Sequence, residues 1–234
     1  MARRVTRAEA DLPATALRVV LASGSPSRLA LLRAAGVEPD VVVSDVDEEA
    51  VAAALGAEAA PGDVVAALAR AKAEAVAERL LAGPGPAPDT VIVAADSAFL
   101  LHGELHGKPH TPEVAWARWQ KMSGQTGTLL TGHCLLRLTD GRIAARAYEV
   151  GRADIRFGDL SGDEARAYLA TGEPLEVAGA FTLEGRGSWF IERIEGDPST
   201  VIGLGLPVLR ALLAQVGLDV AALWQASGSP TGAA

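Results

Sequence analysis

The chain has 234 residues, of which 49% are hydrophobic but only 4% aromatic, so we expect one domain with a core built mainly from Ala, Val and Leu. Lys and Arg number 21 against 29 Asp and Glu, and the formal net charge of −8 disfavours general binding to nucleic acid or to an anionic membrane. The single cysteine, Cys134, excludes an intramolecular disulfide and a cysteine-based zinc site, and it favours a cytoplasmic location.

The two ends of the chain are predicted to lie outside the folded domain. Residues 1–16 are basic at the start but lack an apolar signal core, so they are interpreted as a flexible lead-in. One domain is expected over residues 17–222, followed by a flexible tail over residues 223–234. No stretch reaches eighteen uncharged apolar residues, which argues against a transmembrane helix.

The first third of the chain predicts strand, loop, helix, strand and helix in that order. Residues 17–22 are typical of a buried strand, and a helix follows with Ser25 as its cap and Pro26 as its first residue. Residues 37–46 are predicted to form a second strand. Residues 63–81 predict an amphipathic helix. Its expected buried side comprises Val64, Leu68, Ala71, Ala75 and Leu80.

The rest of the chain predicts antiparallel strands with helices between them. An apolar strand over residues 90–95 leads into Asp96 and continues extended to a hairpin turn at His102 and Gly103. A pair of strands is expected around the turn at Asp140 and Gly141. The remaining predicted elements are helices at 111–122, 161–170 and 206–216, strands at 126–138, 145–157 and 189–193, and a Gly-rich irregular region from 173 to 193. This order predicts a mixed α/β fold.

Three segments carry residue types suited to an anionic ligand. The loop Ser-Gly-Ser-Pro-Ser-Arg at residues 23–28 lies between a strand and a helix start and could bind an anion, although an ordinary capped turn is the alternative. Asp96 ends an apolar strand, where α/β sites gather, or it caps a neighbouring turn. The acidic run at residues 45–49 could supply carboxylates to Mg²⁺, or it is a solvated helix-cap cluster.

The remaining candidates favour structural roles when judged alone. Gly and Pro interrupt the series His102, His106 and His110, so no helix can align these residues around a metal ion. His133 and Cys134 are neighbours in a strand and should point to opposite faces, which argues against a catalytic Cys–His pair. Three lysines are also candidates: Lys72 and Lys121, which by default lie on solvated helix faces, and Lys108, which Gly107 and Pro109 hold in place.

Taken in order, the segments of this chain resemble the Maf-like family of nucleoside triphosphate pyrophosphatases, in an actinobacterial-type variant. The resemblance runs from about residue 19 to residue 213 and includes the loop at 23–28, Ala-Asp-Ser at 95–97, Gly-Lys-Pro at 107–109, Ala-Gly-Ala at 178–180 and Glu-Gly-Arg-Gly at 184–187. It implies a Maf/ITPase-like fold in which a mixed twisted sheet is flanked by helices and two lobes enclose a central cleft. The family often forms homodimers and needs a divalent cation, Mg²⁺ or Mn²⁺.

The resemblance also implies an activity and a role for each matched residue. The family cleaves nucleoside triphosphates to a nucleoside monophosphate and pyrophosphate. The implied catalytic residues are Asp96, as proton acceptor, with Lys72 and Lys108 neutralising the triphosphate. The implied substrate-binding residues are Ser23, Arg28 and Glu184. The implied metal ligands are Glu48 and Asp96.

The chain departs from the common family pattern at three positions, Ser27, Ser97 and Glu184. The changes at residues 27 and 184 occur together in the branch that prefers 7-methylguanosine triphosphate to thymidine or uridine triphosphate. A carboxylate at residue 184 would suit a cationic methylated purine. The preferred base stays open at this point, as does the choice between a base and a metal-ligand role for Asp96. A non-catalytic nucleotide-sensing regulator of cell division and a phosphatase releasing orthophosphate are the alternative functions.

Overall fold

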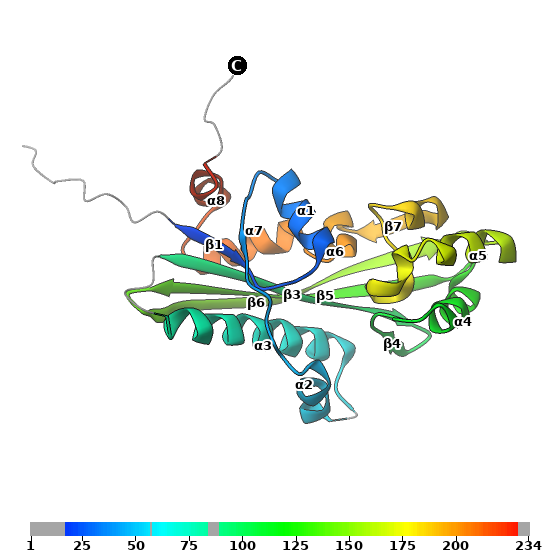
Figure 1. Ribbon diagram of the computed structural model, residues 1–234, viewed down its shortest axis with the longest axis horizontal. Helices are drawn as coiled ribbons and strands as arrows, with labels where there is room; N and C mark the ends of the chain where they lie inside the picture. Colours follow the sequence, from blue (N-terminus) through cyan, green and yellow to red (C-terminus); the bar gives the residue numbers. More distant parts are fainter. Residues whose placement is uncertain (1–16, 57, 84–88, 229–234) are drawn as a thin grey trace, which may run out of the picture.

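A computed structural model describes residues 17–56, 58–83 and 89–228, which form one mixed seven-stranded sheet with helices on both faces (Figure 1). The strand order is β2-β1-β3-β5-β6-β7, and β4 pairs with the C-terminal end of β3. β1 runs parallel to β2 and β3, and the other described pairs are antiparallel. The strands are β1 (Arg18–Leu21), β2 (Asp40–Val41), β3 (Thr90–Leu101), β4 (Glu104–His106), β5 (Thr126–Thr139), β6 (Arg142–Phe157) and β7 (Ile191–Gly196).

The helices cover the two faces and one end of this sheet. They are α1 (Pro26–Ala34), α2 (Glu48–Leu55), α3 (Pro61–Leu81), α4 (Pro112–Met122), α5 (Gly162–Ala170), α6 (Pro198–Ile202), α7 (Leu206–Gln215) and α8 (Val220–Ala226). The 3₁₀ segments are η1 (Glu173–Glu176), η2 (Ala178–Ala180) and η3 (Arg186–Phe190). The predicted mixed α/β class is therefore confirmed. Among the described helices, none is alone long and apolar enough to cross a membrane, although α7 and α8, bent by 95°, pass that test as a pair on length and composition.

Local side-chain chemistry determines where several helices begin. Ser25 caps α1 and Pro26 is its first residue, as the sequence predicts. Ser161 and Glu164 form a reciprocal capping box at the start of α5, because each side chain bonds the backbone N–H of the other residue. Thr111 caps α4 by accepting a hydrogen bond from the Val114 N–H at 3.3 Å, without a reciprocal bond. These predicted helix starts are confirmed.

Alternate residues of the central strands enter two cores on opposite faces of the sheet. One core packs against α7 and includes Val19, Leu21, Val91 and Val93. The other packs against α3 and includes Val20, Ala22, Ile92 and Ala94. In Figure 1, α3 lies on one side of the sheet and α1, α6 and α7 lie on the other. This two-sided burial explains why the strand before Asp96 is apolar at every position.

A third core fills the end of the sheet that α4 and α5 cover. Phe99, Trp119, Phe157 and Phe181 meet there edge-on, with ring centroids 5.0 to 5.8 Å apart. Although aromatic residues are only 4% of the chain, these four are gathered in this one region. β3, β5 and β6 run continuously from the first two cores into the third, so both halves of the molecule share one rigid sheet.

The predicted second strand is largely wrong. Of residues 37–46, only Asp40 and Val41 pair with β1, and β2 is the outer strand of the sheet. Val41 and Val43 are 44% and 51% exposed, so the alternation of apolar residues here does not reflect burial. The acidic run that follows starts α2, and Asp47 caps this helix by accepting from the backbone N–H of Ala50, which confirms the helix-cap alternative for Asp47.

The predicted buried face of α3 is also wrong. The helix itself is confirmed, but only Leu68 of the five residues assigned to its buried side is buried. Its buried residues are Val65, Leu68, Ala69, Lys72, Ala73, Val76 and Ala77. Because alanine occurs all around this helix, the contrast between its faces is weak and periodicity does not determine its rotation.

Three boundaries near the C-terminus differ from expectation. The strand predicted at 189–193 begins later, at Ile191, because residues 186–190 form η3. The short helix α6 follows Asp197, whose carboxylate caps it. The flexible tail predicted from residue 223 is wrong up to residue 226, since α8 extends to Ala226 and buries Leu223 against the first core. The predicted lead-in at 1–16 and the tail at 229–234 lie outside the described residues.

Candidate active site

A gap in the hydrogen bonding along β3 marks the candidate active site. β1 pairs with β3 only as far as Val93, and β4 pairs with it only from Phe99 onward. Between these points residues 94–98 pair with β5 alone, within the part of the chain that the structure describes. The edge of the central strand is therefore uncovered where β1 ends. Asp96 and Ser97 lie in this gap and, as neighbours in a strand, point to opposite faces of the sheet.

On the first face, the first turn of α1 brings Arg28 against the gap. The Arg28 guanidinium donates from Nε to the Gly203 carbonyl at 2.7 Å, from Nη1 to Ser23 Oγ at 3.0 Å and from Nη2 to Ser97 Oγ at 3.0 Å. Burial lowers the pKa of Arg28, and the nearby carboxylates of Asp96 and Glu48 act in the opposite direction. A guanidinium has five N–H donors, so these bonds leave two for an anion.

On the second face, Lys72 of α3 joins two carboxylates. Its Nζ lies 2.5 Å from Asp96 Oδ1 and 2.6 Å from Glu48 Oε1. The side chains of Lys72 and Asp96 are only 11% and 12% exposed, whereas that of Glu48 is 56% exposed. The default view of Lys72 as a solvated surface residue is therefore wrong. The group opens toward solvent on the Glu48 side.

The close approach of α3 to the sheet depends on Gly132, which lies opposite Asp96 in β5. A Cβ atom at Gly132 would lie 2.3 Å from the Val65 carbonyl oxygen. Only glycine fits between the helix backbone and the strand at this point. The missing side chain lets Lys72, two turns further along α3, reach the carboxylate of Asp96.

Sequence reasoning missed a chain of hydroxyl groups beside Arg28. Ser97 Oγ lies 2.9 Å from Thr131 Oγ1, and Thr131 Oγ1 donates to the Thr200 carbonyl at 3.0 Å. Thr131 is completely buried. Together with the Arg28 bond to Gly203, these bonds attach α6 to α1 and to strands β3 and β5. Nothing in the local sequence around Thr131 indicates these contacts, because its partners lie 34 and 69 residues away.

Two of the predicted site residues stand apart from this group. Lys108 is 53% exposed, and its charged neighbour is Glu176, with 4.0 Å between Nζ and Oε2. Glu184 is exposed and lies in the turn before η3. No ion pair between described residues joins either of them to Asp96 or Lys72. The structure thus brings together Ser23, Arg28, Glu48, Lys72 and Asp96, and it places Lys108 and Glu184 on other segments.

The two carboxylates of the group are suitable partial ligands for a divalent cation. Among the described residues, no group of three or more His, Cys, Asp and Glu side chains could hold a metal ion. Mg²⁺ nevertheless needs only one or two carboxylates when substrate phosphates and waters complete its shell. Glu48 and Asp96 already converge on one cation, the Lys72 ammonium. Their donor chemistry therefore fits a metal that binds together with a phosphate ligand.

His133 and Cys134 are both buried beneath the packed faces of β5. His133 is buried, and its Nε2 accepts a hydrogen bond from the Gly205 N–H at 2.8 Å. Burial lowers the pKa of His133 to about 4, so the imidazole is neutral. Cys134 lies in the core under α3, and burial raises the pKa of its thiol to about 12. The two side chains point to opposite faces of β5, which confirms that they form no catalytic pair.

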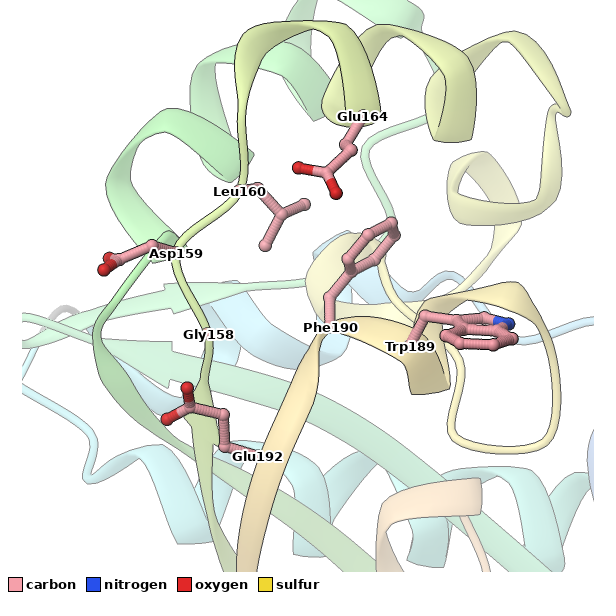
Figure 2. A pocket seen from close by; sticks show the side chains of 7 residues that line it. All are labelled: Gly158, Asp159, Leu160, Glu164, Trp189, Phe190 and Glu192. Atoms are coloured by element: carbon pink, nitrogen blue, oxygen red, sulfur yellow. The ribbon is translucent and has the colours of Figure 1, made fainter.

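A separate surface pocket lies beyond the sheet gap, between α5 and β7 (Figure 2). Its volume is about 410 Å³, and its walls include Leu160, Phe190 and the carboxylate of Glu164. None of the predicted site residues lines it. The candidate active site is therefore not this pocket but the uncovered edge of β3.

The chain is similar to one family model and to several named relatives over most of its length. The family model described as "Maf-like protein" matches residues 18–216. Relatives that carry the name "Nucleoside triphosphate pyrophosphatase" include proteins from Nocardia, Rhodococcus and Mycobacterium. The one from Nocardia farcinica is 58% identical and aligned over 88% of this chain and 96% of its own, and the one from Rhodococcus jostii is 56% identical over 89% and 97%. The one from Mycobacterium marinum is 48% identical over 91% and 99%.

A solved structure from Mycobacterium abscessus, described as a nucleoside-triphosphatase / dITP/XTP pyrophosphatase, aligns with 67% of this chain and 95% of its own. Its TM-score of 0.31 and identity of 13% are too low to support an argument. The family model and the relatives each span most of the chain. On that evidence, the chain belongs to the Maf-like protein family.

Proposed function

We propose that this protein hydrolyses nucleoside triphosphates between the α and β phosphates, releasing a nucleoside monophosphate and pyrophosphate. The observation that carries the proposal is the convergence of Arg28, Lys72, Glu48 and Asp96 on the uncovered edge of β3. A fold needs no such group of buried charges at a strand edge, because burying charge is costly. The relatives named nucleoside triphosphate pyrophosphatase support the same activity.

The reaction requires neutralisation of charge and a positioned water. A triphosphate carries about four negative charges near neutral pH, so catalysis is mainly a matter of positioning and electrostatics. Arg28 can bind phosphate oxygens with its remaining N–H groups. The Lys72 ammonium can stabilise the negative charge that develops on the pyrophosphate leaving group. Asp96 takes the proton from the water that attacks the α phosphorus, and the α–β phosphoanhydride bond breaks.

A divalent cation completes the proposed site. Glu48 and Asp96 would hold it, and when bound it would neutralise phosphate charge and polarise the attacking water. Lys72 holds these two carboxylates close together, which keeps their oxygens oriented toward one point. In this role Lys72 both shapes the carboxylate pair and contributes its own charge to the substrate site.

Lys108 and Glu184 are proposed to contact the more distant parts of the nucleotide. Lys108 is exposed and free to reach a phosphate, since its Glu176 neighbour is 4.0 Å away and half of its side chain is in solvent. Glu184 is exposed in a turn and can accept hydrogen bonds from a purine edge. We therefore propose a preference for 7-methylguanosine triphosphate over thymidine and uridine triphosphates. A homodimer within the cytoplasm, built on one domain per chain, completes the proposal.

The decisive experiment measures products from a panel of nucleoside triphosphates in the presence of Mg²⁺. The proposal expects equal amounts of monophosphate and pyrophosphate, with methylated GTP turned over faster than dTTP or UTP. Orthophosphate as the first product would instead establish a phosphatase. Nucleotide binding without any turnover across the panel would establish a sensor. Faster turnover of dTTP and UTP would remove the base preference but leave the activity.

Asp96→Asn tests the site within that activity. The variant should keep its fold and lose about two to four decades of turnover, the usual range for removal of a general base. Asp140→Asn is the matched control, because Asp140 lies in the exposed β5–β6 turn and Asn-Gly suits that turn equally well. Turnover close to that of the unmodified protein in Asp96→Asn would show that Asp96 is not the proton acceptor.

A further inference from the structure

Glu173, at the start of η1, collects four hydrogen bonds on one partly buried carboxylate. Its Oε1 accepts from the Tyr168 hydroxyl at 3.1 Å, from the Thr182 hydroxyl and from the Gly187 N–H at 3.1 Å. Its Oε2 accepts from the Arg186 N–H at 3.1 Å. Three of these donors lie within residues 182–187, the segment that also carries Glu184. The carboxylate therefore acts as a centre around which this loop is folded.

Gly185 and Gly187 lie so close to Glu173 and to its partner Thr182 that a larger side chain would not fit at either position. A Cβ atom at Gly185 would lie 2.7 Å from Glu173 Oε1, and one at Gly187 would lie 2.6 Å from the Thr182 N–H nitrogen. Burial raises the pKa of Glu173, but the hydrogen bonds from Thr182, Arg186, Gly187 and Tyr168 together lower it below its usual value. The centre is thus an anion held by neutral donors in a tightly packed loop.

The segment that begins with Glu173 is bonded in turn to the loop that carries Lys108. The His110 N–H donates to the Leu175 carbonyl at 3.0 Å, and the Gly179 N–H donates to the Gly107 carbonyl at 3.3 Å. These two bonds lie on either side of Lys108 in the sequence. Glu173 consequently connects the two loops whose exposed charged residues stand apart from the Asp96 group.

We propose that Glu173 is a positioning residue that holds the Glu184 loop in a fixed relation to the Lys108 loop, and that it thereby sets the selectivity of the enzyme among nucleobases. The inference rests on the proposed function, because it assigns the Glu184 loop to the base and Lys108 to the phosphates. Glu173 is partly buried and its carboxylate is occupied by four donors, so it acts through the loop and does not itself bind the nucleotide.

Glu173→Gln tests this role with almost no change of volume. The amide keeps one acceptor oxygen and replaces the other with an NH₂ group, which cannot accept a hydrogen bond. At least one N–H or hydroxyl group that now donates to Glu173 therefore loses its acceptor. We expect KM for the preferred nucleotide to rise about tenfold, the factor for losing one hydrogen bond to a charged acceptor. The ratio of kcat/KM between purine and pyrimidine triphosphates should fall, while kcat on the preferred nucleotide changes little. Glu113→Gln, an exposed Glu in the first turn of α4, is the matched control.

A double variant shows whether the effect passes through the loop. Adding Glu173→Gln to Glu184→Ala should leave the selectivity ratio of Glu184→Ala unchanged, because the disturbed loop no longer carries the residue that contacts the base. Additive changes in the ratio would overturn the proposal. So would a Glu173→Gln variant with a lower Tm but unchanged KM and selectivity, since that result describes a structural role alone.

Two further measurements keep the outcome independent of folding and of turnover. Thr182→Val removes one donor from the loop side with little change of shape and should move KM and selectivity in the same direction by a smaller factor. Unchanged values in a folded Thr182→Val protein would contradict the proposal. Binding of hydrolysis-resistant α,β-methylene triphosphates should show the same loss of base discrimination. If the unmodified protein binds these analogues but hydrolyses no nucleotide, the proposed function fails while the positioning role is still decided by binding.

Discussion

Lys72→Met is expected to destabilise the protein more than any other single change in the candidate active site. Methionine keeps the length and apolar contacts of the lysine stem but removes the ammonium that lies between Asp96 and Glu48. The Asp96 side chain is only 12% exposed and would be left as a buried carboxylate without its ion-pair partner. The predicted damage therefore comes from an uncompensated charge and not from a cavity.

The two arms of the Lys72 interaction contribute very differently. Breaking a buried ion pair by removing one partner costs about 3 to 5 kcal/mol. The Glu48 arm adds little, because its side chain is 56% exposed and solvent screens it. A loss of about 4 kcal/mol corresponds to a fall in Tm of about 8 to 16 °C for a chain of this size. Asp96→Asn should cost only about 1 to 2 kcal/mol, because the asparagine amide oxygen can still accept a hydrogen bond from the Lys72 ammonium.

Thermal unfolding at pH 7 without nucleotide measures these differences directly. The double variant with Lys72→Met and Asp96→Asn should be more stable than Lys72→Met alone, because the buried carboxylate that lost its ammonium partner is gone as well. Lys121→Met serves as the control, since Lys121 is 55% exposed on α4. A Tm for Lys72→Met within about 2 °C of the unmodified protein, or a larger loss for Asp96→Asn than for Lys72→Met, would refute the reasoning.

Two other predictions concern the sheet beneath the site. Gly132→Ala should lower the free energy of unfolding by about 3 kcal/mol and reduce turnover, because the new Cβ would lie 2.3 Å from the Val65 carbonyl oxygen and push α3 away from β5. Calorimetry measures the stability and a pyrophosphate assay measures the turnover. An unchanged Tm would contradict the prediction. The folded pKa of His133, about 4, lies below the unfolded value of about 6.5, so the unfolded chain binds the proton first and stability is lost as pH falls through that window. The loss at pH 5 should be about 2 kcal/mol, and His133→Gln should remove that part of the Tm difference between pH 7 and pH 5; an undiminished difference would show that His133 does not cause it.

The parts of the fold that the sequence predicts correctly depend on short-range contacts. Ser25 and Pro26 begin α1, and Asp140 and Gly141 turn β5 into β6, because the hydrogen bonds or backbone angles involved lie within a few residues. The first half of strand β3 is equally clear, since residues 91–95 are all apolar, as expected for a strand buried on both faces. The order of motifs along the chain also predicted the Maf-like family, which the comparisons confirm.

The rotation of α3 could not be predicted in the same way. Its alanines make every face partly apolar, so the burial of Lys72 follows from the close approach of the helix to Gly132 and not from its own pattern. The valines at 41 and 43 led to a predicted strand that is too long, because their apolar side chains suggested burial although both are exposed. They lie at the outer edge of the sheet, where no further layer covers them.

The sequence by itself determined which charged groups are available to this protein: three cations and three carboxylates within a chain of net charge −8, on segments in a recognisable order. Only the tertiary structure decided which of them meet. Arg28 donates to the carbonyl of Gly203, 175 residues away in the sequence, and Lys72 of α3 binds Asp96 of β3. Lys108 and Glu184 instead depend on loops joined through Glu173. Such contacts depend on how strands and helices pack against one another, and the residues next to each group in the sequence do not determine that packing.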